Sequence, residues 1–320
     1  MRLFLAGHLG MVGAALLRQL QQRPDLTLLL RDRAALDLTD RGAVRAFFAE
    51  ARPEAVILAA ARVGGIGANA AAPADFLAQN LAIALNVIEA AHEAGVQRLL
   101  NLGSSCIYPR QAAQPIAEEA LLTGPLEPTN EGYAIAKIAA LRLCDAHARQ
   151  HGRDYRSVMP CNLYGSGDDF DSETAHVLPA LIARVQAAKE AGAASLSLWG
   201  TGTPRREFLH VDDLAEAALL AMELPHPAWR AALGPDLNHL NIGSGSDIAI
   251  RDLAALVAEV TGYEGAITLD PSRPDGTPRK LMDVSRLAAL GWRPRIGLRA
   301  GIARTHAWYM AQRESAPDLA

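Results

Sequence analysis

The chain of 320 residues is 50% hydrophobic and 21% charged, and its formal net charge is -4. A chain of this length can bury a large core in one large or two unequal domains, and its slightly acidic balance argues against a general nucleic-acid-binding protein. The three cysteines, Cys106, Cys144 and Cys161, show neither zinc-site nor disulfide-scaffold spacing, which is typical of a reducing, cytoplasmic compartment. No stretch approaches the roughly 20 apolar residues of a membrane span, so we expect neither a membrane nor a nucleic acid as partner.

The first predicted strand, residues 2–6, leads into Gly7, and Gly10 and Gly13 follow before an Ala- and Leu-rich helix over 14–20. Glycines between a strand and a helix let the backbone approach a pyrophosphate, whose charge the helix N-terminus stabilises. The spacing alone is a weak signal that an ordinary tight turn would also satisfy. In this context it predicts a dinucleotide-binding turn.

The second predicted strand, residues 26–30, ends at Arg31-Asp32-Arg33. At this place an acidic residue binds a free ribose 2′-hydroxyl, whereas arginine suits a 2′-phosphate. Two arginines against one aspartate favour NADP over NAD. A solvated charged turn is the alternative.

Strands and helices then alternate, which predicts a parallel, doubly wound Rossmann sheet with both faces covered. The expected elements are a helix capped by Asp40 that ends near 51, a strand over 55–61, a flexible loop over 63–67, a helix over 76–94 and a strand over 98–102. The last strand delivers Gly103-Ser104-Ser105-Cys106 to its carboxyl end, where ligands bind in such sheets.

Tyr133 and Lys137 stand four positions apart in a helix-like run, so both side chains lie on one face. The ammonium of Lys137 is expected to favour the ionised form of the Tyr133 phenol. With Ser104, the phenol could hold one carbonyl oxygen, as stabilising a developing alkoxide requires. Taken alone, such a pair recurs by chance on many helices; Thr129, Asn130 and Glu131 before it are candidate helix caps.

Beyond a strand over 155–160 the alternation loosens. A helix over 176–188, a strand over 195–200 and the charged run 205–213 follow. We expect a cofactor domain over 1–165, with segments returning near 205–220 and 240–245, and a smaller substrate domain over 166–320. No His, Cys and Asp group shows metal-ligand spacing, so no metal is expected, and His8 and His210 are interpreted as structural.

Five motifs together resemble one family, over residues 1 to about 310. They are the glycine turn, Gly103-Ser104-Ser105-Cys106-Ile107-Tyr108-Pro109, the run 127–137, the run 205–213 and the run from Pro274 to Lys280. The chain is similar to the extended short-chain dehydrogenase/reductases and, among them, to the GDP-L-fucose synthase family. The resemblance implies conversion of GDP-4-keto-6-deoxy-D-mannose to GDP-L-fucose, by epimerisation at carbons 3 and 5 and reduction of the 4-ketone with NADPH.

The resemblance also implies residue roles. Tyr133 would donate the proton for reduction, Lys137 would tune it and bind the nicotinamide ribose, and Ser104 would hydrogen-bond the 4-oxygen. Cys106 would remove the protons at carbons 3 and 5, and His176 would return them. Without the resemblance, Cys106 reads as a small buried hydrophobe and His176 as a surface or capping residue.

Further ligand contacts are expected on the same basis. The cofactor residues are Gly7, Gly10, Met11, Val12, Gly13, Arg31, Arg33, Asp37, Leu38, Leu102, Gly103, Ser105, Lys137, Pro160, Asn162, Leu163 and His176. The GDP-sugar residues are Arg184, Trp199, Arg206, Asp275 and Lys280.

Leu9 departs from the family, which usually carries arginine at this place in the glycine turn. The loss weakens the preference for NADP and leaves Arg33 and Arg31 to carry it. Two other functions stay open: a colitose-type or deoxyheptose-type synthase acting on another GDP-4-keto sugar, and a non-enzymatic NADP-binding sensor. A homodimer packed through 78–94 and 134–148 is also expected.

Overall fold

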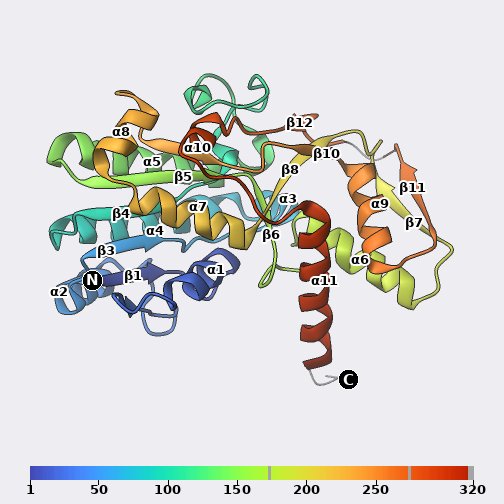
Figure 1. Cartoon of the computed structure of the whole chain (residues 1–320), viewed down its shortest axis with the longest axis horizontal. Coiled ribbons are helices and arrows are strands. Elements are labelled where there is room, and N and C mark those ends of the chain that lie inside the picture. The colour runs from blue at the N-terminus through green and yellow to red at the C-terminus, as the bar shows by residue number, and fades with distance from the viewer. Residues whose placement is uncertain (172–173, 273–274, 316–320) are drawn as a thin grey trace.

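The computed structural model describes residues 1–171, 174–272 and 275–315; Pro274, part of one quoted motif, lies outside these ranges. Its centre is a six-stranded parallel sheet with the order β2-β1-β3-β4-β5-β9 (Figure 1). The strands are β1 (Arg2–Ala6), β2 (Thr27–Leu29), β3 (Ala55–Leu58), β4 (Arg98–Leu102), β5 (Asp154–Pro160) and β9 (His239–Ile242). The order reverses direction between β1 and β3, and such switch points are where open α/β sheets bind ligands.

Helices cover both faces of this sheet, which confirms the predicted doubly wound architecture. One face packs against α1 (Met11–Leu20) and α7 (Val211–Glu223). The other packs against α2 (Arg41–Ala51), α4 (Pro73–Glu93) and α5 (Glu131–His151). All four residues of β3 are buried, as expected of a parallel strand with a helix layer on each side.

Several local predictions hold to the residue, and others do not. The strand over 98–102 is β4, and Asp40 caps α2 by accepting a hydrogen bond from the amide of Ala43 at 3.0 Å. Helix α1 begins at Met11 rather than at 14, and β3 ends at Leu58 rather than at 61. The loop expected over 63–67 is wrong in its second part, because α3 (Ile66–Ala71) begins there with Gly65 as its N-cap.

The second half of the chain adds smaller sheets. Strand β8 (Arg205–His210) pairs with β6 (Asn162–Tyr164), β10 (Asp247–Ala249) and β12 (Arg279–Lys280), while β7 (Ser195–Trp199) pairs with β11 (Ala266–Asp270). The further helices are α6 (Val177–Glu190), α8 (His226–Leu233), α9 (Ile250–Thr261), α10 (Ser285–Ala289) and α11 (Leu298–Ser315), of which α8 and α10 pack on the core of the large sheet. A separate apolar cluster joins α6, α9, α11 and β7, to the right in Figure 1. The division near 165 stays a prediction.

Across the parts of the chain that the structure describes, no helix combines the length and the hydropathy that crossing a membrane requires.

Candidate active site

Tyr133 and Lys137 lie on the first turns of α5, next to the carboxyl end of β4. The ammonium of Lys137 donates to the backbone oxygen of Leu102 at 2.8 Å, and its Nζ lies 5.7 Å from the centroid of the Tyr133 ring. Lys137 is only 7% exposed, so this hydrogen bond fixes the ammonium in place. The predicted pairing on one helical face is therefore confirmed in position.

The protonation of the pair differs from the prediction. Burial raises the pKa of the Tyr133 phenol above its usual value, and nearby Cys106 adds to this rise; the hydrogen bond with Ser104 opposes it. Burial also lowers the pKa of Lys137 to about 8. The expected lowering of the phenol pKa by Lys137 is wrong, because burial sets the direction of the shift and Lys137 is not among its causes. A protonated phenol at neutral pH is the state that a proton donor requires.

Cys106 lies on the short 3-10 helix over Ser105–Ile107, directly after β4. Ser104 caps this helix, with its hydroxyl oxygen accepting from the amide of Cys106 at 3.2 Å. The half-buried sulfur of Cys106 receives two donors: Asn130 Nδ2 at 3.3 Å and Lys280 Nζ at 3.9 Å. An amide and an ammonium are therefore both directed at one sulfur.

Both donors differ from their predicted roles. Asn130 was expected only as a helix cap; it is the N-cap residue of α5, but its side chain makes no capping hydrogen bond because the amide points to Cys106. Lys280 was expected at the nucleotide and instead lies at the sulfur. Nothing in the sequence signals either contact beyond the closeness of Asn130 to Tyr133.

His176 is the N-cap residue of α6 and is exposed. The surrounding protein still desolvates the imidazole enough to lower its pKa, and Asp169 partly opposes this shift. The preceding segment is fastened to the start of α3, because the amide of Gly65 donates to the backbone oxygen of Thr174 at 2.8 Å. His176 is therefore held where α6 and α3 approach one another.

The glycine turn fits a dinucleotide. A Cβ on Gly13 would lie 1.9 Å from the backbone oxygen of Gly7, and one on Gly7, at φ +88°, would lie 2.6 Å from the backbone of Ala60. These two glycines are required by the packing of β1, α1 and β3. Gly10 is exposed and open, and it begins α1, which has no side-chain cap and no acidic residue in its first turn. Such a helix N-terminus, with Met11 and Val12 in its first turn, suits a phosphate.

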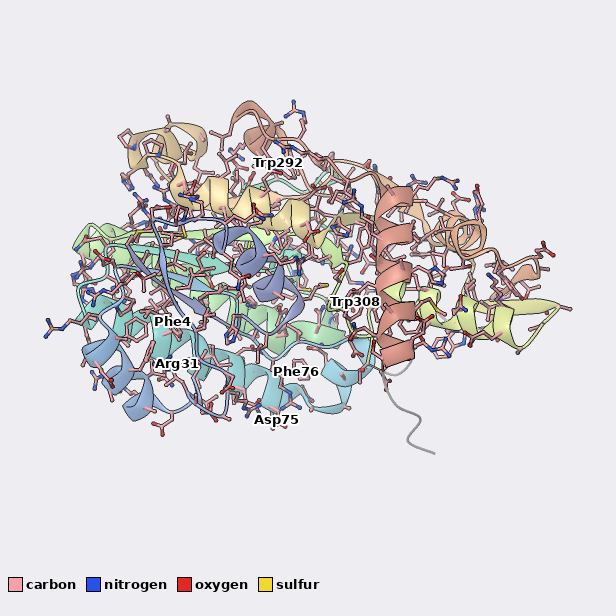
Figure 2. The ribbon with its side chains drawn as sticks, turned by 60° about the horizontal axis from the view of Figure 1, so that its bottom comes forward. Phe4, Arg31, Asp75, Phe76, Trp292 and Trp308 are labelled. Atoms are coloured by element: carbon pink, nitrogen blue, oxygen red, sulfur yellow. The ribbon has the colours of Figure 1, made fainter. Side chains whose placement is uncertain are left out.

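The residues expected at the ribose lie beside this turn. Arg31 stacks over the ring of Phe47, 5.3 Å from its centroid, on the side of the sheet where Phe4 packs against α2 (Figure 2). Arg33 has an 80% exposed side chain, 4.0 Å from Asp37. Leu9 is 73% exposed. One arginine stacked on Phe47, one arginine beside Asp37 and one uncovered apolar side chain thus lie near the expected place of the ribose.

The other expected cofactor residues stand at or beyond the carboxyl ends of strands. Leu102, Gly103 and Ser105 follow or end β4, Pro160 ends β5, and Asn162 and Leu163 lie on β6. Leu38 lies in the turn before α2. Gly103 permits close packing, since a Cβ there would lie 2.2 Å from the sulfur of Met159.

The residues expected at the GDP end surround β7 and β8. Arg184 donates to the backbone oxygen of Ser197 at 2.5 Å, and Trp199 is 68% exposed. Arg206 donates to the backbone oxygen of Thr277 at 2.6 Å, and burial lowers its pKa. The carboxylate of Asp275 accepts from the amide and hydroxyl of Thr201 at 3.0 and 2.7 Å, so it closes a turn.

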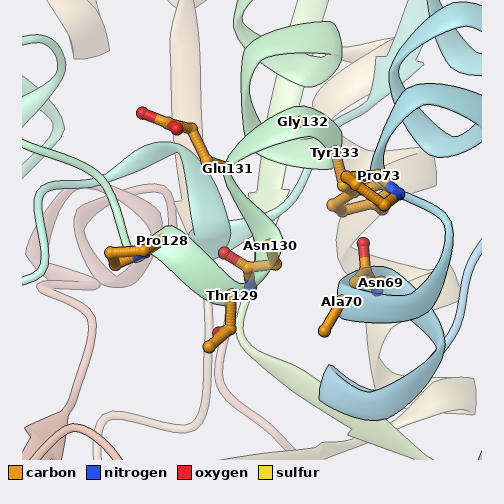
Figure 3. A pocket seen from close by; sticks show the side chains of 9 residues that line it. All are labelled: Asn69, Ala70, Pro73, Pro128, Thr129, Asn130, Glu131, Gly132 and Tyr133. Carbon is orange, nitrogen blue, oxygen red and sulfur yellow. The ribbon is translucent and has the colours of Figure 1, made fainter.

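A pocket of about 220 Å³ opens beside Tyr133 (Figure 3). It is lined by Asn69, Ala70, Pro73, Pro128, Thr129, Asn130, Glu131, Gly132 and Tyr133. Asn69 Oδ1 and Asn130 Oδ1 are buried and accept no hydrogen bond from the residues that the structure describes. Two unsatisfied acceptors in a pocket beside the phenol can receive hydroxyl groups of a ligand. The sequence analysis missed Asn69.

Comparisons with known proteins agree on this architecture. Residues 3–243 match the NAD dependent epimerase/dehydratase family. The chain is 55% identical over 313 residues to GDP-L-fucose synthase of Escherichia coli (strain K12), covering 98% of both chains. It is 53% identical over 309 residues to GDP-L-fucose synthase 1 of Arabidopsis thaliana, covering 97% of this chain and 93% of that one. It is also similar to the solved structure of MlghC, a GDP-mannoheptose C4 reductase from Campylobacter jejuni with NADP bound, at TM-score 0.86 and 35% identity, covering 97% and 98%.

Proposed function

The chain belongs to the NAD dependent epimerase/dehydratase family, and from this premise we propose that it converts GDP-4-keto-6-deoxy-D-mannose to GDP-L-fucose. It is an oxidoreductase with epimerase activity, and NADP(H) is its cofactor. The observation that carries the proposal is the arrangement of Ser104, Cys106, Tyr133 and Lys137 at the end of β4. It places a sulfur that receives hydrogen bonds from Asn130 and Lys280 near a phenol that burial keeps protonated.

Epimerisation is assigned to Cys106 and His176. The Cys106 thiolate takes a proton from carbon 3 or carbon 5, both of which the neighbouring ketone acidifies. The charge moves onto the 4-oxygen as an enolate, which the hydroxyls of Ser104 and Tyr133 stabilise by hydrogen bonds. His176 in its protonated form returns a proton to the opposite face, and this inverts the centre.

Reduction is assigned to Tyr133 and Lys137. NADPH, when held by the glycine turn, would supply the hydride that carbon 4 receives. Tyr133 passes its phenolic proton to the 4-oxygen, and the nearby Lys137 ammonium stabilises the phenolate that remains. The buried Lys137 ammonium donates to the backbone oxygen of Leu102 and pairs with no carboxylate among the residues that the structure describes, so it stays near the ring.

Ligand binding is divided between the two halves of the chain. The glycine turn and the N-terminus of α1 bind the pyrophosphate, and Arg31 and Arg33 bind the 2′-phosphate. Arg184, Arg206 and Trp199 bind the GDP group. Asn69 and Asn130 accept hydroxyls of the sugar in the pocket beside Tyr133.

The test is incubation with GDP-4-keto-6-deoxy-D-mannose and NADPH in deuterated water. GDP-L-fucose with deuterium at carbons 3 and 5, together with oxidation of NADPH, is the expected result. If NADPH is oxidised but no deuterium appears at carbons 3 and 5, the enzyme is a 4-ketone reductase without epimerase activity. Turnover restricted to other GDP-4-keto sugars would favour the colitose-type or heptose-type reading, which is supported more weakly by 35% identity to the heptose reductase. Cofactor binding without any turnover would favour the sensor.

A homodimer in the cytoplasm belongs to the same proposal. Leu85 on α4 and Ile135 on α5 are 50% and 42% exposed, and a second copy packed on these helices would cover both. Sedimentation velocity tests this: the wild-type protein should sediment as a dimer, and Leu85→Glu should shift it to the monomer. A monomeric wild type would overturn this part.

A further inference from the structure

Three histidines meet at the far end of α4 and α5 from Tyr133. His92 lies near the end of α4, and His147 and His151 lie four residues apart on the last turns of α5. One nitrogen from each lies within 4.8 Å of the other two. At about 1.5 Å rise per residue, His147 is roughly 21 Å along α5 from Tyr133, so the trio is separate from the active site.

In the buried member of the trio, one ring nitrogen is hydrogen-bonded and the other has no hydrogen-bond partner among the described residues. His147 is 6% exposed, and its Nε2 is 2.8 Å from the carboxylate of Glu89. Its Nδ1 is buried and has no hydrogen-bond partner among the described residues. A carboxylate that fixes one nitrogen of a histidine while the other faces a metal is the usual support of an imidazole ligand.

The rings of the other two imidazoles lie close to His147 and to each other. The His92 ring lies 4.5 Å from the ring of His147 and 4.3 Å from that of His151, between centroids. Arg153 donates to His92 Nδ1 at 3.2 Å, which leaves Nε2 as its ligand nitrogen. His151 is exposed and can turn.

Two charged side chains lie beside the trio. Glu89 is 2.8 Å from Nε2 of His147, and the Arg153 guanidinium donates to Nδ1 of His92 at 3.2 Å. The positive charge of Arg153 disfavours the binding of a metal cation, and the negative charge of Glu89 offsets this effect.

We propose that His92, His147 and His151 bind one divalent transition-metal ion of the zinc class. Three imidazoles with a water in the fourth position form a common tetrahedral arrangement, and imidazole suits zinc, copper and nickel rather than magnesium or calcium. Bond lengths of about 2.0–2.1 Å place ligand nitrogens roughly 3.3 Å apart, so the trio contracts on binding, chiefly through the exposed His151. The ion joins the ends of α4 and α5. The sequence analysis expected no metal; His147 and His151 have the i, i+4 spacing that places two ligands on one helical face, and no spacing signals His92.

The test uses the full chain without a histidine tag, stripped with a chelator and titrated with zinc chloride by calorimetry. We expect one ion per chain, a rise in melting temperature with zinc, and a visible absorption spectrum typical of tetrahedral coordination when cobalt replaces zinc. His151→Ala should lose at least about 10-fold in affinity without disturbing the core, and His147→Ala should lose binding. His226→Ala, which removes an exposed histidine on α8, is the matched control and should bind as the wild type does.

Two results would overturn the proposal. One is the absence of stoichiometric zinc binding by the wild-type protein. The other is equal binding by wild type and His151→Ala, which would place the ion elsewhere. Epimerase and reductase rates serve as a check on folding, and they should be unchanged in His151→Ala because the trio is remote from the reacting atoms.

Discussion

Replacement of Lys280 by methionine should slow proton exchange at carbons 3 and 5 much more than it weakens substrate binding. The Lys280 ammonium lies 3.9 Å from the sulfur of Cys106, a separation at which opposite unit charges attract by about 4 kcal/mol at an effective dielectric constant of about 20. Lys280 is partly exposed, so solvent screening reduces this to about 1–3 kcal/mol. A change of about 1 kcal/mol corresponds to about 5-fold in rate and a change of about 3 kcal/mol to about 150-fold. We therefore expect the rate of proton exchange to fall by about 5- to 150-fold.

The assay measures deuterium uptake at carbons 3 and 5 by NMR in deuterated water, with NADP⁺ in place of NADPH so that the ketone is not reduced. Lys189→Met is the control, since it removes the same ammonium from α6, where Lys189 donates to the backbone oxygen of Thr261 at 2.7 Å. Unchanged exchange with a raised KM would refute the reasoning. It would mean that Lys280 binds the nucleotide, as the sequence analysis predicted.

Three further predictions concern proton donation, cofactor choice and stability. Tyr133→Phe should lower ketone reduction by about 10²- to 10⁴-fold while exchange at carbons 3 and 5 continues; stopped-flow NADPH oxidation measures the first, and normal reduction would exclude the phenol as donor. Leu9→Arg should widen the ratio of kcat/KM for NADPH over NADH by about 10-fold, since Leu9 is uncovered beside the ribose position; an unchanged ratio would show that the turn does not face the phosphate. Burial raises the pKa of the fully buried Glu207 to about 7 from 4.5, so its folded state binds the proton more tightly. Protonation of Glu207 therefore adds about 3 kcal/mol to the free energy of unfolding below pH 4.5, and this stabilisation is lost as the pH rises through 7. The free energy of unfolding in urea should fall between pH 5 and pH 9 in the wild type and fall much less in Glu207→Gln. An equal fall in both proteins would contradict the prediction.

Local patterns explain which parts of this structure could be predicted. The Asp40 cap, the limits of β4 and the shared face of Tyr133 and Lys137 all depend on residues within four positions of each other. A strand followed by glycines and a helix specifies the dinucleotide turn for the same reason.

Contacts between distant residues could not be predicted in this way. Cys106 meets Asn130 and Lys280 at separations of 24 and 174 residues, and no spacing rule connects them. The Tyr133 phenol was expected to be acidified because its neighbour Lys137 is visible in the sequence, whereas the burial that raises its pKa is a property of the packed site.

The position of Lys280 makes the surroundings of the Cys106 sulfur depend on a very short strand. Strand β12 has only two residues, Arg279–Lys280, and its partner is β8, whereas Ser104, Tyr133 and Lys137 follow β4 or lie on α5, within the large sheet and its helices. Short elements open locally before the whole protein unfolds. In rising denaturant, proton exchange at carbons 3 and 5 would then disappear first, and the protein would pass through a state that still holds a ketone but can no longer invert its neighbours.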